Sequence, residues 1–106
     1  MAEEVLIVLT TWPTVEAARA AGRAAVEEKL AACANLLPGV ESIYRWEGKV
    51  ETASEVLMIF KTTIGRYPQL ETRIKALHSY AVPEIVSLRV TDGLPAYLRW
   101  VEASCV

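Results

Sequence analysis

The chain is poor in the residues from which most catalytic and metal sites are built. It contains one histidine, His78, and two cysteines, Cys33 and Cys105, which do not form a C-x-x-C pair. A zinc knuckle or a dithiol redox motif requires such a pair. No G-x-S-x-G, P-loop or G-x-G-x-x-G motif is present, and no nucleophile motif accompanies the histidine. We therefore expect a protein that is not an enzyme.

Long hydrophobic runs and clusters of one charge are also lacking. The longest apolar run of the N-terminal segment is Val5–Leu9, whereas a membrane helix needs about 20 apolar residues and a secretory signal needs a basic start. The net charge is −2 and no run of Lys or Arg stands out, so nucleic acid and anionic membranes are not expected as partners. These features predict a cytoplasmic protein whose cysteines are reduced.

What the chain does contain is an ordinary globular composition. Of its 106 residues, 53% are hydrophobic and 23% are charged, which is typical of a soluble domain with a buried core. We predict one domain over residues 1–106.

The order of apolar patterns and turn signals predicts an α+β fold. Residues 5–11 and 84–90 are predicted as strands, and a hairpin within 35–63 reverses at Gly48. One helix is predicted from an N-cap at Thr14 to about Cys33, with Val15, Ala18, Gly22, Ala25, Val26 and Leu30 on its apolar side. A second helix begins at Pro68, and a third follows residues 92–94.

The resulting order, β-α-β-β-α-β plus a C-terminal helix, is that of the ferredoxin-like split βαβ fold, with an antiparallel sheet. The segments VLIVLTT (5–11) and VLMIFKT (56–62) resemble each other, and each leads into a helix marked by proline. This similarity supports two βαβ halves.

The predicted hairpin is longer than the rest of its sheet. Strands of roughly ten residues on either side of Gly48 would span about 30 Å, while the first and last strands have only about seven residues each. The hairpin should therefore project beyond the sheet and carry Trp46 near its tip. Trp46 could fold back onto its own sheet, but we favour burial against a neighbouring copy, which makes the protein an obligate homo-oligomer.

Three carboxylates, those of Glu47, Glu51 and Glu55, cluster in this hairpin. Spacings of four residues on an extended segment do not define a paired acid and base. We therefore interpret the three as part of a solvated hairpin tip.

Metal ligation is the remaining chemistry that the residues offer. A thiolate from Cys33 and an imidazole from His78 suit copper, zinc or similar ions better than magnesium or calcium. Each residue also has a structural interpretation: Cys33 as a small buried side chain, and His78 as a cation at the end of a helix. The sequence leaves open whether the two residues meet within one subunit or across an interface.

Several dispersed motifs resemble the CutA family, the divalent-cation tolerance proteins. The segments that carry the resemblance are AACANLLPGVESIYRWEGKV, EVLMIFKTT and HSYAVPEIVSL. The matched positions are Ala32, Cys33, Asn35, Pro38, Ser42, Tyr44, Trp46, Gly48, Glu55, Lys61, Thr62, His78, Tyr80, Pro83 and Glu84. The resemblance implies a ferredoxin-like subunit in a tight homotrimer similar to the PII signalling proteins, with a role in tolerance to copper and other divalent cations and with copper binding.

The chain departs from the family pattern at two positions. Ser79 stands where the family has proline, and Thr10 stands where some members have a further cysteine that could bind metal. The first functional hypothesis is a trimeric protein that responds to copper or another divalent cation and binds it through Cys33 and His78.

Two other functions stay open. The first is a PII-like sensor that holds a small molecule or an anion in the cleft between subunits, near Lys61, Tyr80 and Glu84. The second is a structural trimer that binds a protein partner and has no ligand of its own.

Overall fold

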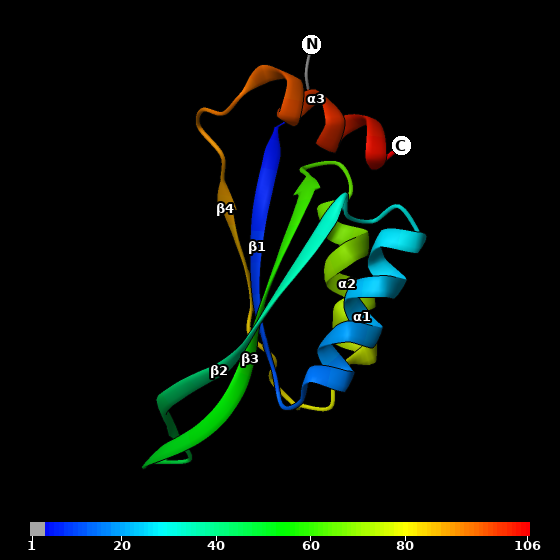
Figure 1. The fold of residues 1–106 in the computed structure, drawn as a ribbon. Helices are drawn as coiled ribbons and strands as arrows, with labels where there is room; N and C mark the ends of the chain where they lie inside the picture. The colour runs from blue at the N-terminus through cyan, green and yellow to red at the C-terminus, as the bar shows by residue number, and fades with distance from the viewer. Residues whose placement is uncertain (1–3) are drawn as a thin grey trace.

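A computed structural model describes residues 4–106, so that residues 1–3 of the predicted domain lie outside the described part of the chain. The elements follow one another in the predicted order (Figure 1). They are β1 (Val5–Trp12), α1 (Val15–Glu27), β2 (Cys33–Trp46), β3 (Lys49–Thr63), α2 (Tyr67–Leu77), β4 (Ile85–Arg89) and α3 (Pro95–Ser104).

The strands form one antiparallel sheet in the order β2-β3-β1-β4. Helices α1 and α2 lie side by side on one face of this sheet, and α3 lies across its upper end (Figure 1). The α+β, ferredoxin-like prediction is therefore confirmed. No helix within residues 4–106 is long and apolar enough to cross a membrane.

The core lies between the sheet and the two helices, because alternate strand residues point to the same face. Val8 and Trp12 of β1 and Met58 and Phe60 of β3 are buried there against small residues of α1 and apolar residues of α2. Gly22 allows the closest approach, since a Cβ at this position would lie 3.1 Å from the Met58 sulfur.

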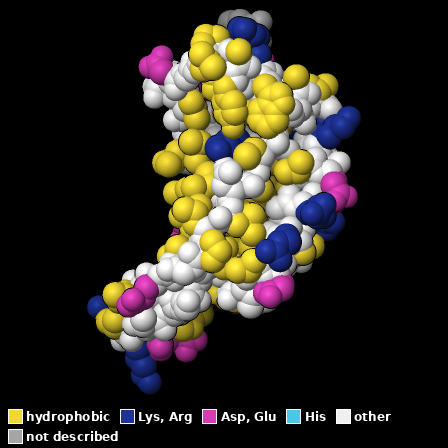
Figure 2. Space-filling view, viewed as in Figure 1, with side chains coloured by type: hydrophobic (Ala, Val, Ile, Leu, Met, Phe, Trp, Pro, Cys, Tyr) yellow, Lys and Arg dark blue, Asp and Glu magenta, His cyan; other side chains and the backbone are white. Residues whose placement is uncertain are grey.

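Among residues 4–106, no helix covers the opposite face of the sheet (Figure 1). Leu88 of β4 is 54% exposed, and apolar residues of the other strands are partly exposed beside it. Figure 2 shows hydrophobic side chains over β4 and the upper body, while charged side chains gather at the hairpin tip and on the helical side. The aliphatic residues of this open face are Ile7, Leu9, Leu37, Leu57, Ile59, Val86 and Leu88.

The first helix starts as predicted but ends earlier. The Ala17 N–H donates to the Thr14 side chain at 3.1 Å, which confirms the N-cap. The helix stops at Glu27, because Lys29 adopts a left-handed backbone (φ 61°) and the Leu30 N–H donates to the Ala25 carbonyl.

Two parts of the helix prediction are therefore wrong. Cys33 does not end this helix but begins β2, and Val26 is 40% exposed instead of facing the sheet. The sequence does not reveal this end because a lysine occupies the left-handed position that glycine usually takes.

The hairpin formed by β2 and β3 projects beyond the sheet as predicted, and it is longer than expected. Its strands have 14 and 15 residues, and the described chain measures 47 × 25 × 22 Å. Trp46 pairs with Lys49 across a two-residue turn in which Glu47 and Gly48 both have positive φ, as a type I′ turn requires. Trp46 is 46% exposed, so it does not fold back into the interior of its own chain.

Candidate functional site

A pocket of about 590 Å³ lies where the hairpin leaves the body of the sheet. Three parts of the chain form it: the end of β1, the facing parts of β2 and β3, and the connection between α2 and β4. This volume is in the range of ordinary small-molecule sites. The residues that line it are Thr11, Ser42, Ile43, Tyr44, Trp46, Glu55, Tyr80, Ala81, Val82 and Glu84.

A β-bulge at Pro38 and Gly39 turns the distal half of β2 toward this pocket. Leu37 pairs with Leu57 and Val40 pairs with Glu55, so β2 has one residue more than β3 across this interval. Gly39 supplies the left-handed backbone (φ 80°) that such an irregularity often needs. The extra residue reverses the alternation in β2. As a result, Ser42, Tyr44 and Trp46 share the face of Glu55.

Glu55 and Tyr80 form the polar centre of the pocket. The Tyr80 hydroxyl donates to Glu55 Oε2 at 2.7 Å, and Glu55 is only 8% exposed. Burial, followed by the hydrogen bond to Glu55 and its negative charge, raises the pKa of Tyr80 to about 12, so this hydroxyl keeps its proton at neutral pH. The other carboxylate oxygen, Oε1, accepts no hydrogen bond from the described residues.

The burial of Glu55 corrects the prediction that all three hairpin carboxylates are solvated. Glu47 and Glu51 are indeed exposed. Glu55, in contrast, lies at the root of the hairpin, where Tyr80 covers it. Because this contact joins residues 25 positions apart, local spacing could not reveal it.

His78 lies against Tyr80 and is held by contacts within the chain. Its Nδ1 accepts the Tyr80 backbone N–H at 3.2 Å, and Nε2 lies 2.7 Å from the Thr11 carbonyl oxygen. Since a carbonyl can only accept, Nε2 must carry the proton and donate it. The ring also stacks on Trp12, with centroids 4.1 Å apart. Both ring nitrogens are therefore engaged, and neither offers a free lone pair to a metal.

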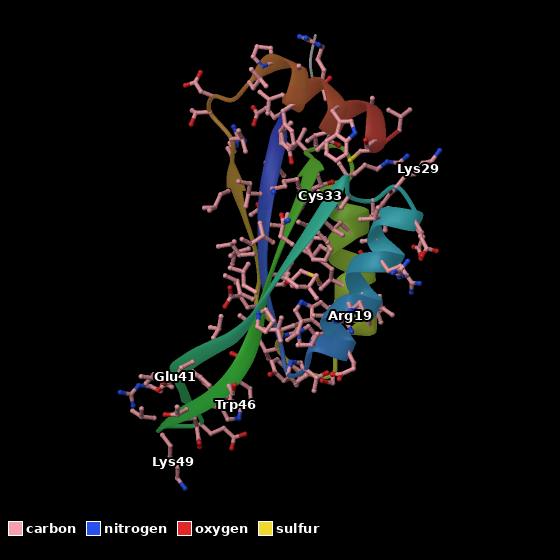
Figure 3. All side chains as sticks on the ribbon, in the orientation of Figure 1. Arg19, Lys29, Cys33, Glu41, Trp46 and Lys49 are labelled. Atoms are coloured by element: carbon pink, nitrogen blue, oxygen red, sulfur yellow. The ribbon has the colours of Figure 1, made fainter. Side chains whose placement is uncertain are left out.

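Cys33 lies in a different part of the sheet. It begins β2 and pairs with Lys61, whose Nζ donates to Asn35 Oδ1 at 2.7 Å; the Cys33 thiol lies 3.5 Å from the same oxygen. Figure 3 places Cys33 and Trp46 at opposite ends of β2.

The predicted ligands Cys33 and His78 are thus not brought together within one chain. His78 contacts Thr11, which pairs with Leu57 of β3, whereas Cys33 pairs with Lys61 of the same strand. Leu57 and Lys61 are four residues apart, which is about 13 Å along a strand. In the part of the chain that the structure describes, no group of three or more His, Cys, Asp or Glu side chains is placed to hold a metal ion. Within residues 4–106 of a single chain, the side chains therefore form no cluster that fits a copper or zinc centre.

The three residues predicted for a small-molecule site are divided in the same way. Tyr80 and Glu84 both line the pocket, whereas Lys61 lies with Cys33 and does not. The sequence does not identify Glu55 as a residue of the site, although Glu55 stands in the motif that ends in Lys61 and Thr62. The Pro38-Gly39 pair is the one local feature of the sequence that could indicate how β2 turns toward the pocket, because such a pair is typical of a β-bulge.

The pocket and the elements around it fall within a region of recognised family similarity. Residues 6–104 match the family described as CutA1 divalent ion tolerance protein. This chain belongs to the CutA1 family. The resemblance inferred from the motifs is therefore confirmed.

Individual relatives agree with this assignment. The divalent-cation tolerance protein CutA of Thermus thermophilus is 50% identical over 95 residues, which cover 90% of this chain and 92% of that protein. The chloroplastic CutA of Arabidopsis thaliana is 43% identical over 99 residues, but they span only 54% of that protein. The crystal structure of CutA from Xylella fastidiosa superimposes with a TM-score of 0.94 at 39% identity, covering 96% of this chain and 98% of that chain.

Proposed function

We propose that this protein acts in the tolerance of divalent cations, copper among them, as a cytoplasmic homotrimer that catalyses no reaction. The observation that carries the proposal is the family match over residues 6–104, together with relatives that are named for divalent-cation tolerance. The identities of these relatives are high enough for a shared role to be a reasonable inference.

The open sheet face supports the homotrimer. Leu88 is 54% exposed, and Ile43 on the hairpin is 69% exposed, which is unfavourable for apolar side chains in a lone subunit. In addition, β4 is the last strand of the sheet, so within residues 4–106 its outer edge pairs with no other strand. Sister subunits would bury the open face, and a sister hairpin would pair with the β4 edge.

Direct copper binding through Cys33 and His78 stays a prediction, and it would require residues of two subunits. His78 would also have to release the Tyr80 N–H or the Thr11 carbonyl before it could bind a metal.

The test of metal binding is calorimetric titration of the full-length protein with Cu(I), Cu(II) and Zn(II). We expect copper binding to be lost in a Cys33→Ser, His78→Ala double variant and to persist in Cys105→Ser, which removes the other thiol. Equal binding by the double variant would exclude these two residues, while absence of binding to the wild type would argue against direct metal binding altogether.

A second candidate function is a sensor of a small molecule, and the pocket favours it. Tyr80 and Glu84, which were predicted for such a site, both line a cavity of suitable volume. A thermal-shift screen tests this candidate. We expect some small metabolites to raise the melting temperature when metals do not. Stabilisation by metals alone would contradict it.

A further inference from the structure

We propose that the pocket at the root of the hairpin binds a small organic cation that combines N–H donors with an apolar body. This inference rests on the second candidate function, the small-molecule sensor, and assigns the charge of its ligand.

The charge of the pocket residues carries the first step. Two carboxylates, those of Glu55 and Glu84, line the pocket, and none of the lining residues is Lys, Arg or His. Lys61, the cation that an anion-binding site would have used, lies with Asn35 outside it. A partly enclosed site of this charge attracts cations and repels carboxylates and phosphates.

The hydrogen bonding of Glu55 carries the second step. Tyr80 holds Oε2 and fixes the orientation of the carboxylate, while Oε1 accepts no hydrogen bond from residues 4–106. A residue that is only 8% exposed keeps such an oxygen where water, a ligand or, in the proposed homotrimer, a sister subunit can satisfy it. Because Oε1 can only accept, the group that satisfies it must be a donor, as an ammonium or guanidinium N–H is.

The aromatic side chains carry the third step. Tyr44, Trp46 and Tyr80 line the same pocket as the two carboxylates. Aromatic faces attract organic cations and also bury their apolar parts, whereas a strongly hydrated metal ion gains little from them. Aromatic rings combined with carboxylates therefore favour an organic cation over a divalent metal at this site.

The test uses three probes that share a benzene ring and differ in charge: benzylammonium, benzyl alcohol and benzoate. Each is titrated calorimetrically into the full-length wild-type protein at pH 7. We expect benzylammonium to bind at least about tenfold more tightly than benzyl alcohol, since a hydrogen bond between charged groups is lost in the alcohol. Benzoate should not bind.

Two variants and a matched control locate the binding site. Glu84→Gln removes one carboxylate of the pocket and should weaken benzylammonium about tenfold, and Trp46→Leu removes an aromatic face and should weaken it about threefold. Glu41→Gln removes an exposed carboxylate of the same hairpin that lies on the other face of β2 and does not line the pocket, and it should leave binding unchanged. The sedimentation mass of each variant is compared with that of the wild type, so that a change in assembly is not mistaken for a change in the site.

Several results would overturn the proposal, and they differ from those that would overturn the proposed function. Equal binding of benzylammonium and benzyl alcohol would show that charge does not select the ligand. Preference for benzoate would leave a small-molecule sensor but with an anionic ligand. Binding of copper or zinc with no binding of benzylammonium would leave the metal-tolerance role intact and remove the organic cation. Failure of all three probes would show that the pocket is not an open site in the assembled protein.

Discussion

Replacing Tyr80 by phenylalanine tests the polar centre of the pocket. The substitution removes one hydroxyl and leaves the buried Glu55 carboxylate without the donor that now lies 2.7 Å from Oε2. A hydrogen bond to a charged acceptor contributes about 1.5–3 kcal/mol to stability. Because Glu55 lines the pocket, where water can reach its carboxylate, we expect the lower part of this range, a loss of about 1.5–2 kcal/mol at pH 7.

The same contact predicts how this loss depends on pH. The pKa of Tyr80 is raised to about 12 from the model-peptide value of 10.0, so the folded chain keeps a proton that the unfolded chain releases first. The stability that Tyr80 contributes is therefore fully present below pH 10 and is lost as the pH rises toward 12. The difference between wild type and Tyr80→Phe should be constant from pH 7 to pH 9.5 and should shrink above pH 10.

The assay is guanidinium chloride denaturation at one fixed protein concentration, since the proposed homotrimer would make the midpoint depend on concentration. Tyr67→Phe and Tyr97→Phe are the controls. Tyr67 donates to the exposed Glu71 at 3.0 Å, and Tyr97 is 41% exposed, so each change should cost no more than about 0.5 kcal/mol. A loss of equal size for all three tyrosines, or a Tyr80→Phe loss that persists at pH 12, would show that the hydrogen bond between Tyr80 and Glu55 is not the source of this stability.

Two further substitutions test the backbone and packing that position the hairpin. Glu47→Asn should raise the free energy of unfolding by about 0.5–1 kcal/mol. Glu47 has a left-handed backbone (φ 49°), which asparagine adopts more readily than glutamate. A lower denaturation midpoint would contradict the assignment of a type I′ turn. Gly22→Ala should lower the free energy of unfolding by about 1 kcal/mol, although alanine has the better helix propensity. The new Cβ would lie 3.1 Å from the buried Met58 sulfur and 3.2 Å from the Ala34 Cβ. A gain in thermal stability would show that β2 can move away to accommodate the extra methyl group.

The order of elements and the projecting hairpin could be predicted from the sequence because their signals are local. Thr14 caps the first helix, Gly48 takes part in the turn, and strand patterns are readable over a few residues. The end of α1 could not be predicted, since Lys29 occupies the left-handed position without the glycine that usually marks it.

The candidate site could be predicted only in part, because tertiary register decides which side chains meet. Tyr80 and Glu84 are predicted for a ligand site in a cleft between subunits; both line one pocket of the chain, and their role in binding stays a prediction. Glu55 was assigned to solvent, since nothing near it in the sequence shows that Tyr80 covers it. Cys33 and His78 were paired by chemical type, but strand register separates them within a chain.

The proposed homotrimer requires that sister subunits cover the open sheet face. Sedimentation velocity of the full-length protein at about 1 µM measures this directly. One chain has a mass of 11.7 kDa. The proposed homotrimer predicts a single species of about 35 kDa, which is the mass of three chains. A species of one chain's mass, with an open sheet face and a solvent-exposed hairpin, would contradict it.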